Sequence, residues 1–385
     1  PGRGGGGGRG GARGRVSVVL GPRGRGRRLR GRRPAPADGV AVAERLGGIQ
    51  AQVTSAAETA AALRHPTAEP GGVSQALQTG ALIKTWAMRG TLHAITPDFA
   101  RAVLPLLASA RIWEKPSWQK NFGATPAQVA ALAEAVATVL DGAVLTRAEL
   151  VDSVLADSRF HALGEQLASG WGAMLKPLAW QGVLCHGPAR GANITFTSPA
   201  RAARNWGPLL APDAAAPEVI TTYLGAYGPA TQEAFNAWLM RGAFGKTIVR
   251  QWFADLGDAL TEVDIEGRRA WLRTADAEDL AGITPEPSVH LLGPFDQYIL
   301  GPGTNDTAVL PAEHRAKVSR TAGWISPLVL TNGRITGTWE SADDLLTVTM
   351  FTGRAPATHL LREQVTAVAR ATARTGPLTL ELRTA

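Results

Sequence analysis

The sequence is poor in the residues that build disulfide frameworks, metal sites and membrane spans. Its single cysteine, Cys185, allows no internal disulfide and no cysteine-rich zinc site, which favours a reducing cytoplasm. No apolar run approaches the roughly 18 residues that cross a bilayer, and the N-terminus lacks the apolar core of a signal peptide. No metal-ligand spacing, phosphate-cradling glycine loop or nucleophile elbow occurs. We therefore expect a protein without membrane contact, metal ion or nucleotide cofactor.

Positive charge is concentrated at one end of the chain. The formal net charge is +8, and residues 1–34 hold 11 arginines and no acidic residue. The remaining 351 residues carry 29 basic and 32 acidic side chains, so the part able to fold is not basic as a whole. A nucleic-acid site in that part must come from local clustering of cations.

Residues 1–36 form a low-complexity Gly/Arg segment with 13 glycines. Because so few apolar side chains cannot offset the entropy of ordering, we expect this segment to be disordered. Two interpretations stay open: an RGG-like tail that binds nucleic acid, and a mis-assigned start or shifted frame in GC-rich DNA, since no initiator methionine is present. We expect the segment to be dispensable for activity.

From about Ala37 the sequence predicts three helices and a hairpin. Residues 40–46 form a helical pattern stopped by two glycines, and further helices are expected over residues 56–63 and 72–77. Two strands, residues 82–88 and 91–95, then flank a turn at Arg89-Gly90. This order is typical of a winged helix, whose hairpin is the wing, and predicts one over residues 37–120.

The same order returns twice. The helix-start signals are Thr125-Pro126, the capping box of Thr146 with Glu149, and Thr231. The expected elements are helices 125–140, 146–150 and 171–181 with hairpin 183–196, then helices 217–227, 232–239 and 245–256 with hairpin 260–272. Such repetition predicts winged helices over residues 121–212 and 213–285.

Residues 286–385 have a different character. Strands are expected over residues 335–340, 345–351 and 378–382, with an Asn332-Gly333 hairpin turn and one helix over residues 358–373. This pattern predicts a small β-rich, barrel-like domain. The fold class expected for the whole chain is α+β: three tandem winged helices followed by that domain.

Four segments together resemble one known family. They are Ile49-Gln50-Ala51-Gln52, Arg89-Gly90-Thr91-Leu92-His93, the run from Phe295 to Gly301, and the run from Asn332 to Trp339. In order and rough spacing they are similar to the winged-helix DNA glycosylases of the AlkZ and YcaQ type, from about residue 40 to the C-terminus. The resemblance implies a C-shaped set of three winged helices with a β-rich C-terminal domain, acting on alkylated DNA.

The resemblance also implies a catalytic motif. It is Gln-x-Gln in the AlkZ branch and Gln-x-Asp in the YcaQ branch, and Gln50 and Gln52 fit the former. Glutamine cannot ionise, so it cannot be a general base, but it can hold a water molecule and turn its dipole toward positive charge on the sugar. That suffices where the leaving base is already cationic, as in N7-alkylguanine. The alternative is that both glutamines cap a helix or line a groove.

We therefore expect a monofunctional DNA glycosylase for cationic alkylated purines, interstrand crosslinks included, in DNA repair or self-resistance. Its partner would be double-stranded DNA with alkylated bases. Arg89 and His93 are candidates for contact with a phosphate or the lesion strand, although His93 equally fits a packed strand position. Further candidate phosphate contacts, each of which also fits a solvated charge, are Lys84, Arg147, Lys176, Arg190, Lys246 and Arg250.

Three further interpretations follow from the sequence. Asp296 resembles a catalytic acid, but a structural turn role is favoured because it lies far from the glutamines. Most of the 11 tryptophans are expected in the core, and one of them can stack on a flipped base without the sequence showing which. A non-catalytic winged-helix regulator is the competing class. Such a regulator would dimerise on paired half-sites, whereas tandem winged helices in one chain make a monomer in the nucleoid sufficient.

Overall fold

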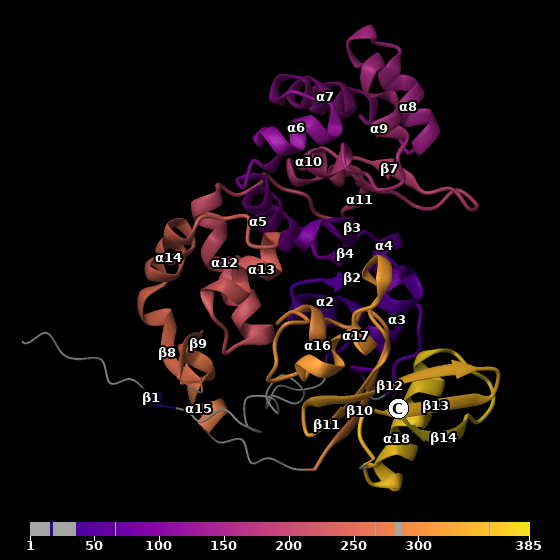
Figure 1. Ribbon diagram of the computed structural model, residues 1–385. Coiled ribbons are helices and arrows are strands. Elements are labelled where there is room, and N and C mark those ends of the chain that lie inside the picture. The colour runs from indigo at the N-terminus through magenta and orange to yellow at the C-terminus, as the bar shows by residue number, and fades with distance from the viewer. Residues whose placement is uncertain (1–15, 18–35, 66, 266, 282–286, 354) are drawn as a thin grey trace, which may run out of the picture.

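The computed structural model describes residues 16–17, 36–65, 67–265, 267–281, 287–353 and 355–385. It is a mixed α/β protein with sheets of three, five and six strands. Figure 1 shows a central group around β2–β4, a group with α6–α9 above it, a group with α12–α14 on the left, and the C-terminal sheet at lower right. None of the helices in these ranges is long and apolar enough to span a bilayer.

The central group agrees closely with its sequence pattern. Asp38 caps the first helix, and Gly47, with φ of 61°, ends it and directs the chain into β2. The Glu58 carboxylate accepts hydrogen bonds from three backbone N–H groups at the start of the helix Gly72–Gln78. These are donors that the helix itself cannot pair. The elements are α2 (Gly39–Leu46), β2 (Ile49–Gln50), α3 (Thr54–Ala62), α4 (Gly72–Gln78), β3 (Ile83–Trp86) and β4 (Leu92–Ile95).

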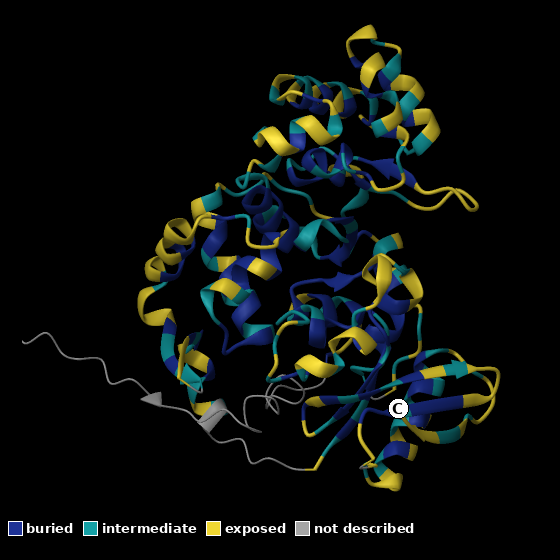
Figure 2. Ribbon diagram, viewed as in Figure 1, coloured by how far each residue is buried: buried dark blue, intermediate teal, exposed yellow. Residues whose placement is uncertain are grey.

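Two hairpins expected as separate wings share one sheet. The six strands lie in the order β2-β4-β3-β6-β7-β5, and Lys84 of β3 pairs with His186 of β6. The additional strands are β5 (Leu145–Thr146), β6 (Cys185–His186) and β7 (Thr195–Thr197). Figure 2 shows this sheet largely buried between the helical groups. The pairing therefore joins the central and upper groups through backbone hydrogen bonds.

The upper group confirms two predicted helix starts. Thr125 and Thr146 each form a capping box, with Gln128 and Glu149. The helix predicted from Trp171 begins at Leu175, because the left-handed Gly172 (φ 61°) turns the chain first. The helices that follow the central hairpin are α5 (Pro97–Ala108), which packs on α12, and then α6 (Pro116–Phe122), α7 (Pro126–Val139), α8 (Arg147–Leu155), α9 (Gly164–Ala168), α10 (Leu175–Trp180) and α11 (Pro199–Ala202).

In the third group Thr231 caps its helix as predicted, and the first helix begins at Pro212, not at Pro217. The elements are α12 (Pro212–Tyr227), α13 (Gln232–Met240), α14 (Lys246–Asp255), β8 (Leu260–Ile265), β9 (Arg268–Arg273) and α15 (Ala277–Ala281). The two-residue strand β1 (Val16–Ser17) pairs in parallel with β8. Apart from β1 and Pro36, the predicted disorder of residues 1–36 concerns positions outside the described residues.

The C-terminal sheet is open, so the expected barrel-like domain is wrong. Its order is β10-β11-β12-β13-β14, and in the described part of the chain β10 and β14 are its edges. Strand β14 runs parallel to β13, and the crossover helix α18 packs on β10, so a helix covers the sheet instead of strand closure. The elements are β10 (Val289–Leu292), α16 (Gln297–Leu300), α17 (Arg315–Val318), β11 (Leu328–Thr331), β12 (Arg334–Ala342), β13 (Leu345–Met350), α18 (Thr358–Ala371) and β14 (Thr379–Thr384).

A buried ion pair connects this sheet to the central group. Arg64, just after α3, donates two hydrogen bonds of 2.8 and 2.7 Å to the carboxylate of Asp296, which is 0% exposed. Burial alone lowers the pKa of Arg64, but the charge and hydrogen bonds of Asp296 raise it above its ordinary value. Asp296 also accepts the backbone N–H of Tyr298 at the start of α16. The structural interpretation of Asp296 is therefore confirmed.

Removing one partner of this pair should strongly destabilise the protein. We expect Asp296→Ala to lower the free energy of unfolding by about 3–5 kcal/mol, because Arg64 is left charged and buried. Urea denaturation measures the change. Arg159→Ala is the control, since its ion pair with Asp157 is exposed (68% and 37%) and should matter little. Similar midpoints for the two variants would contradict the importance of the buried pair.

Candidate active site

The two glutamines stand at the edge of the six-stranded sheet. Gln50 ends β2 and is 7% exposed, while Gln52 follows the strand and is exposed. β2 pairs antiparallel with β4, and Gln50 lies opposite His93 in the register. Because directly opposite residues point to the same face of a sheet, the side chains of Gln50 and His93 meet there.

Arg89 fixes the orientation of the Gln50 amide. It occupies the turn between β3 and β4 with φ of 59°, and its Nη2 donates to Gln50 Oε1 at 3.2 Å. The Thr91 hydroxyl approaches the same oxygen at 3.5 Å. The carbonyl of Gln50 is thus occupied by protein donors, and its amide NH₂ is the part left for a substrate or water.

The charge of Arg89 is buried without a carboxylate partner among the described residues. Its Nη1 is buried and has no hydrogen-bond partner. Burial is the main reason why the pKa of Arg89 is lowered to about 10; the charge of Arg241 acts in the same direction, and Tyr227 and Tyr223 oppose it. At neutral pH the group still carries its proton, so the site presents a desolvated cation with one unused donor.

His93 is a neutral internal residue. It is 0% exposed, and its Nδ1 lies 3.0 Å from the carbonyl oxygen of Thr91, so Nδ1–H donates and Nε2 carries a lone pair toward Arg89 Nη2 at 3.5 Å. Burial lowers the pKa of His93 to about 3, and the charge of Arg89 acts in the same direction. Of the two interpretations open for His93, its full burial on a covered strand fits the packed position.

Gln52 has a freer amide than Gln50. Its Oε1 accepts a long hydrogen bond of 3.4 Å from the backbone nitrogen of Leu92. An amide oxygen has two lone pairs, so Gln52 can still accept a hydrogen bond from a water molecule. The two glutamines thus offer a donor and an acceptor. The donor is the NH₂ of Gln50, whose oxygen is held by Arg89, and the acceptor is Oε1 of Gln52 at the surface.

Two more cations lie beside Arg89, from helices distant in sequence. Nε of Arg241, the left-handed residue that ends α13, donates to the backbone oxygen of Arg89 at 3.0 Å. A Cβ at Gly90 would lie 3.7 Å from Cδ of Lys176 on α10. Burial and then the charge of Arg241 lower the pKa of Lys176. Arg241 is not among the residues predicted from the sequence, although a basic residue before Gly242 at a helix end is a visible signal.

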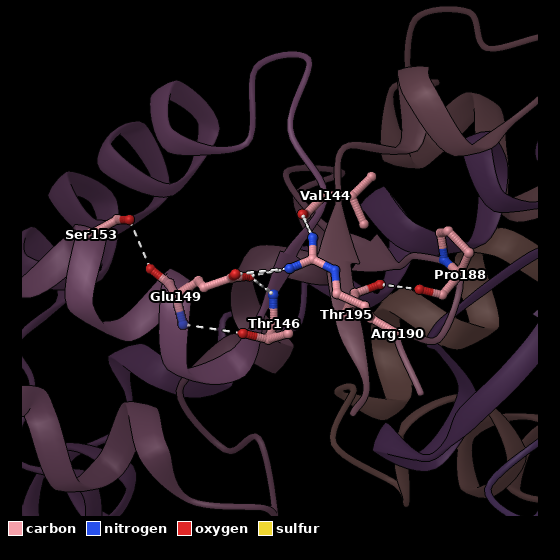
Figure 3. A network of polar contacts seen from close by, with 7 residues as sticks. All are labelled: Val144, Thr146, Glu149, Ser153, Pro188, Arg190 and Thr195. Carbon is pink, nitrogen blue, oxygen red and sulfur yellow. Dashed lines mark hydrogen bonds and ion pairs between the residues drawn. The ribbon is translucent and has the colours of Figure 1, made fainter. Parts of the chain in front are cut away.

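Two of the predicted phosphate contacts have internal partners. Figure 3 shows Arg190 at the hairpin tip bound to Glu149 at 2.8 Å and to the carbonyl oxygen of Val144 at 2.7 Å. Nη1 of Arg147 donates to the backbone carbonyls of Leu167 in α9 and of Ser169 in the loop before α10. A basic residue in a sequence gives no sign of the partners it has in the fold. Arg147 is held by contacts within the upper group, whereas Arg190 is 53% exposed and stays a predicted phosphate contact.

The remaining predicted contacts are accessible. Lys246 and Arg250 are exposed on α14. Lys84 is half-buried, and its Nζ lies 3.4 Å from the Thr54 hydroxyl, in a groove of about 760 Å³ between the central and upper groups. Burial lowers the pKa of Lys84. Within the described ranges, no cluster of three or more side chains suited to a metal ion occurs.

Comparisons with known proteins agree on one family. The family model described as DNA glycosylase AlkZ-like matches residues 43–380. A curated relative from Streptomyces sahachiroi, the interstrand DNA cross-link repair glycosylase, is 54% identical over 311 residues, which cover 80% of this chain and 84% of the relative. The solved structure of Streptomyces sahachiroi DNA glycosylase AlkZ superposes with a TM-score of 0.89 at 48% identity, covering 96% of this chain and 100% of that one.

The neutral state of His93 predicts how stability depends on pH. Unfolded histidine takes up a proton near pH ~6.5, whereas burial keeps the pKa of His93 at about 3 in the fold. The stability that neutral His93 contributes is fully present above the pKa of the unfolded state, and it is lost as the pH falls toward the pKa of the folded state. His93→Gln should therefore flatten the fall in unfolding free energy between about pH 6 and pH 4 by up to ~1.4 kcal/mol per pH unit.

Chemical denaturation at a series of pH values measures that slope. Part of it should remain in the variant, because burial, together with Lys84 and Arg147, also lowers the pKa of His186 to about 3. His161→Gln, at an exposed position, is the control and should leave the slope unchanged. An unchanged slope in His93→Gln would show that His93 is protonated in the fold.

Proposed function

The chain belongs to the AlkZ-like DNA glycosylase family, and from that premise we propose that it excises cationic alkylated purines, N7-alkylguanine above all, with Gln50 and Gln52 as its catalytic residues. The observation that carries the proposal is the pair of amides at the sheet edge, one of them held by a buried arginine. The competing class, a regulator without catalysis, is not favoured by membership of an enzyme family.

The proposed architecture is three winged helices, over residues 37–120, 121–212 and 213–285, followed by a β-rich domain over residues 286–385. Support comes from the recurring order of three helices and a hairpin. That order is α2-α3-α4-β3-β4 in the first, α7-α8-α10-β6-β7 in the second and α12-α13-α14-β8-β9 in the third. Since helix-turn-helix units dock a helix in a DNA groove, three in one chain let a monomer hold a duplex.

The proposed chemistry uses the substrate's own charge. An N7-alkylated purine is a cation that leaves as a neutral base, so no protein acid is needed. Gln52 accepts a hydrogen bond from the attacking water, because its oxygen has a lone pair left, while the NH₂ of Gln50 donates to the same water. The water oxygen bonds to C1′ as the C1′–N9 bond breaks, the electron pair leaves with the neutral base, and the proton of the water passes to solvent. Both dipoles are set before the positive charge develops at C1′. A pair of amides thus suits activated bases and not neutral ones.

Arg89 is proposed to act on the DNA backbone beside the lesion through its charge. A cationic base and a desolvated arginine repel each other, so the positive field of Arg89 should attract a phosphate, while its buried Nη1 makes no direct contact. Lys176 and Arg241 then contribute to the same positive region. Lys84 in the groove and Lys246 and Arg250 on α14 are proposed to contact phosphates farther along the duplex.

Interstrand crosslinks are proposed as a further substrate. The relative with 54% identity is named an interstrand DNA cross-link repair glycosylase. A crosslink needs space for a base that remains tethered to the opposite strand, and the groove beside Lys84 is open to solvent. The protein is proposed to act as a monomer in DNA repair or in self-resistance to a DNA-alkylating metabolite, at the nucleoid.

Replacing both glutamines should abolish excision but not binding. We expect Gln50→Ala/Gln52→Ala to lower the single-turnover excision of N7-methylguanine by at least about 100-fold, the usual loss when a preorganised polar group is removed. Affinity for the same duplex should stay within a few-fold of wild type. Alkaline cleavage at the abasic product measures excision, and fluorescence anisotropy measures affinity.

Gln119→Ala is the matched control, because Gln119 lies on α6 and bonds only a local backbone oxygen. Near wild-type excision by the double variant would refute the assignment of the glutamines. A wild-type protein that releases no N7-methylguanine from duplex DNA would instead refute the proposed substrate.

The proposed phosphate contacts predict salt dependence. Lys246→Ala and Arg250→Ala should each reduce the slope of log K against log salt concentration by about one unit, because each contact with a phosphate releases one counterion. Titrations between about 50 and 200 mM salt cover the useful range. Arg383→Ala, whose residue pairs with Glu381 on β14, is the control. Slopes equal to wild type would remove α14 from the DNA interface.

A further inference from the structure

One large aromatic side chain is left in solvent. Trp171, between α9 and α10, is 78% exposed, which presents on the order of 150 Å² of mainly apolar surface. Among the described residues Trp324 is the next most exposed tryptophan, with 42% of its surface accessible. Its ring packs edge to face on Phe295, with 4.9 Å between the ring centroids. A single exposed apolar residue is common, so the weight of this observation depends on how the loop is held and where it lies.

The loop that carries Trp171 is held by contacts to the rest of the upper group. Nη1 of Arg147 donates to the carbonyl oxygen of Ser169 at 3.0 Å, and its guanidinium lies 5.1 Å above the Phe196 ring. The Trp171 N–H faces the Ser169 hydroxyl at 3.4 Å, and the N–H of Gly172 donates to the Ser169 carbonyl at 3.1 Å. The backbone is thus fixed while the indole is free, so the indole can engage a partner at little cost in loop entropy.

Three successive contacts connect this loop to Gln52. Gly172 packs so closely on the Trp86 ring that a Cβ there would clash with it. Trp86 of β3 pairs with Leu92 of β4 in the sheet register. The backbone nitrogen of Leu92 donates to Gln52 Oε1 at 3.4 Å. The exposed indole therefore belongs to the structural unit that carries the candidate catalytic amide.

The helix that follows the loop brings a cation to the same region. Lys176 on α10 lies against Gly90, next to Arg89. An aromatic platform beside cations is the combination by which proteins hold nucleic acid bases and backbone together. In minor-groove binders and architectural proteins, apolar side chains inserted between base steps unstack them and bend the duplex.

We propose that Trp171 is the stacking wedge of this enzyme: its indole inserts against the base pair next to the lesion and holds the duplex open while Gln50 and Gln52 act on the damaged nucleotide. The inference rests on the proposed function for its substrate. Arg147 acts as a positioning residue, because it holds the carbonyls that shape the loop and not a phosphate.

The test measures binding and excision separately. The probe is a duplex with 2′-fluoro-N7-methylguanosine, whose glycosidic bond resists hydrolysis, compared with the same duplex undamaged. Trp171→Ala should weaken binding to the lesion duplex by about 5- to 150-fold, the range found when one base–aromatic stack is removed. Trp171→Phe should retain most of the affinity. The salt slope should be unchanged in both, since no phosphate contact is lost.

Two further variants sharpen the test. Arg147→Met should weaken lesion binding in the same direction but less, again with an unchanged salt slope. Leu382→Ala, an exposed apolar residue on β14 that is 45% exposed, is the matched control and should bind as wild type. Melting temperatures of the Trp171 and Leu382 variants should match wild type, because both side chains are solvated and bury little in the fold. Arg147→Met should melt lower, because it loses the hydrogen bonds and the Phe196 contact of Arg147.

Each outcome decides the proposal. Wild-type affinity and excision rate in Trp171→Ala would overturn it, and so would a change of association state at unchanged DNA affinity, which would make Trp171 a protein contact. A wild-type protein that binds the lesion through Trp171 but excises nothing would leave the wedge intact and refute the proposed function. If the wild-type protein and Trp171→Ala both excise N7-methylguanine at the normal rate, the proposed role of Trp171 is refuted and the proposed function stands.

Discussion

A desolvated positive charge organises the candidate site. Arg89 is enclosed in the turn of the central hairpin, and no carboxylate in the described structure balances it. Because the charge persists at neutral pH, the groups around it adapt: the Gln50 amide turns its oxygen inward, and His93 stays neutral with a lone pair toward the guanidinium. Preorganisation of this kind lets uncharged amides contribute to catalysis, since their dipoles need not reorient during the reaction.

The shared six-stranded sheet keeps this arrangement in place. The pairing of β3 with β6 fixes the upper group against the central hairpin, so α10 lies beside Gly90 and the loop before it lies on Trp86. The backbone of Arg89 is in turn bound by Arg241 at the end of α13. Two segments distant in sequence, α10 and the end of α13, thus support one turn, and a site supported by strands and helices is more exact than one placed on a free loop.

The sequence was informative wherever structure is decided by neighbours along the chain. Thr125, Thr146 and Thr231 cap their helices as predicted, because a cap depends on residues three positions away. Contacts between distant segments carry no such signal. Nothing in the local pattern links Lys84 to His186 or distinguishes Arg190, which binds Glu149, from an arginine that faces solvent. The glutamines were identified through family resemblance, since their spacing alone is uninformative.

The ion pair between Arg64 and Asp296 also has a consequence for the order of events during synthesis. The two residues are 232 positions apart, so at typical translation rates Asp296 leaves the ribosome roughly 10 to 50 s after Arg64. During that interval the α3 end of the central group holds an arginine whose counter-ion does not yet exist. The charges of Arg64 and Arg89 both act to lower the pKa of Tyr227, against the larger effect of burial, which raises it. The contact between the central group and the C-terminal sheet is therefore expected to form late, and a ribosome stalled before that point would carry a chain in which Arg64 lacks its carboxylate partner.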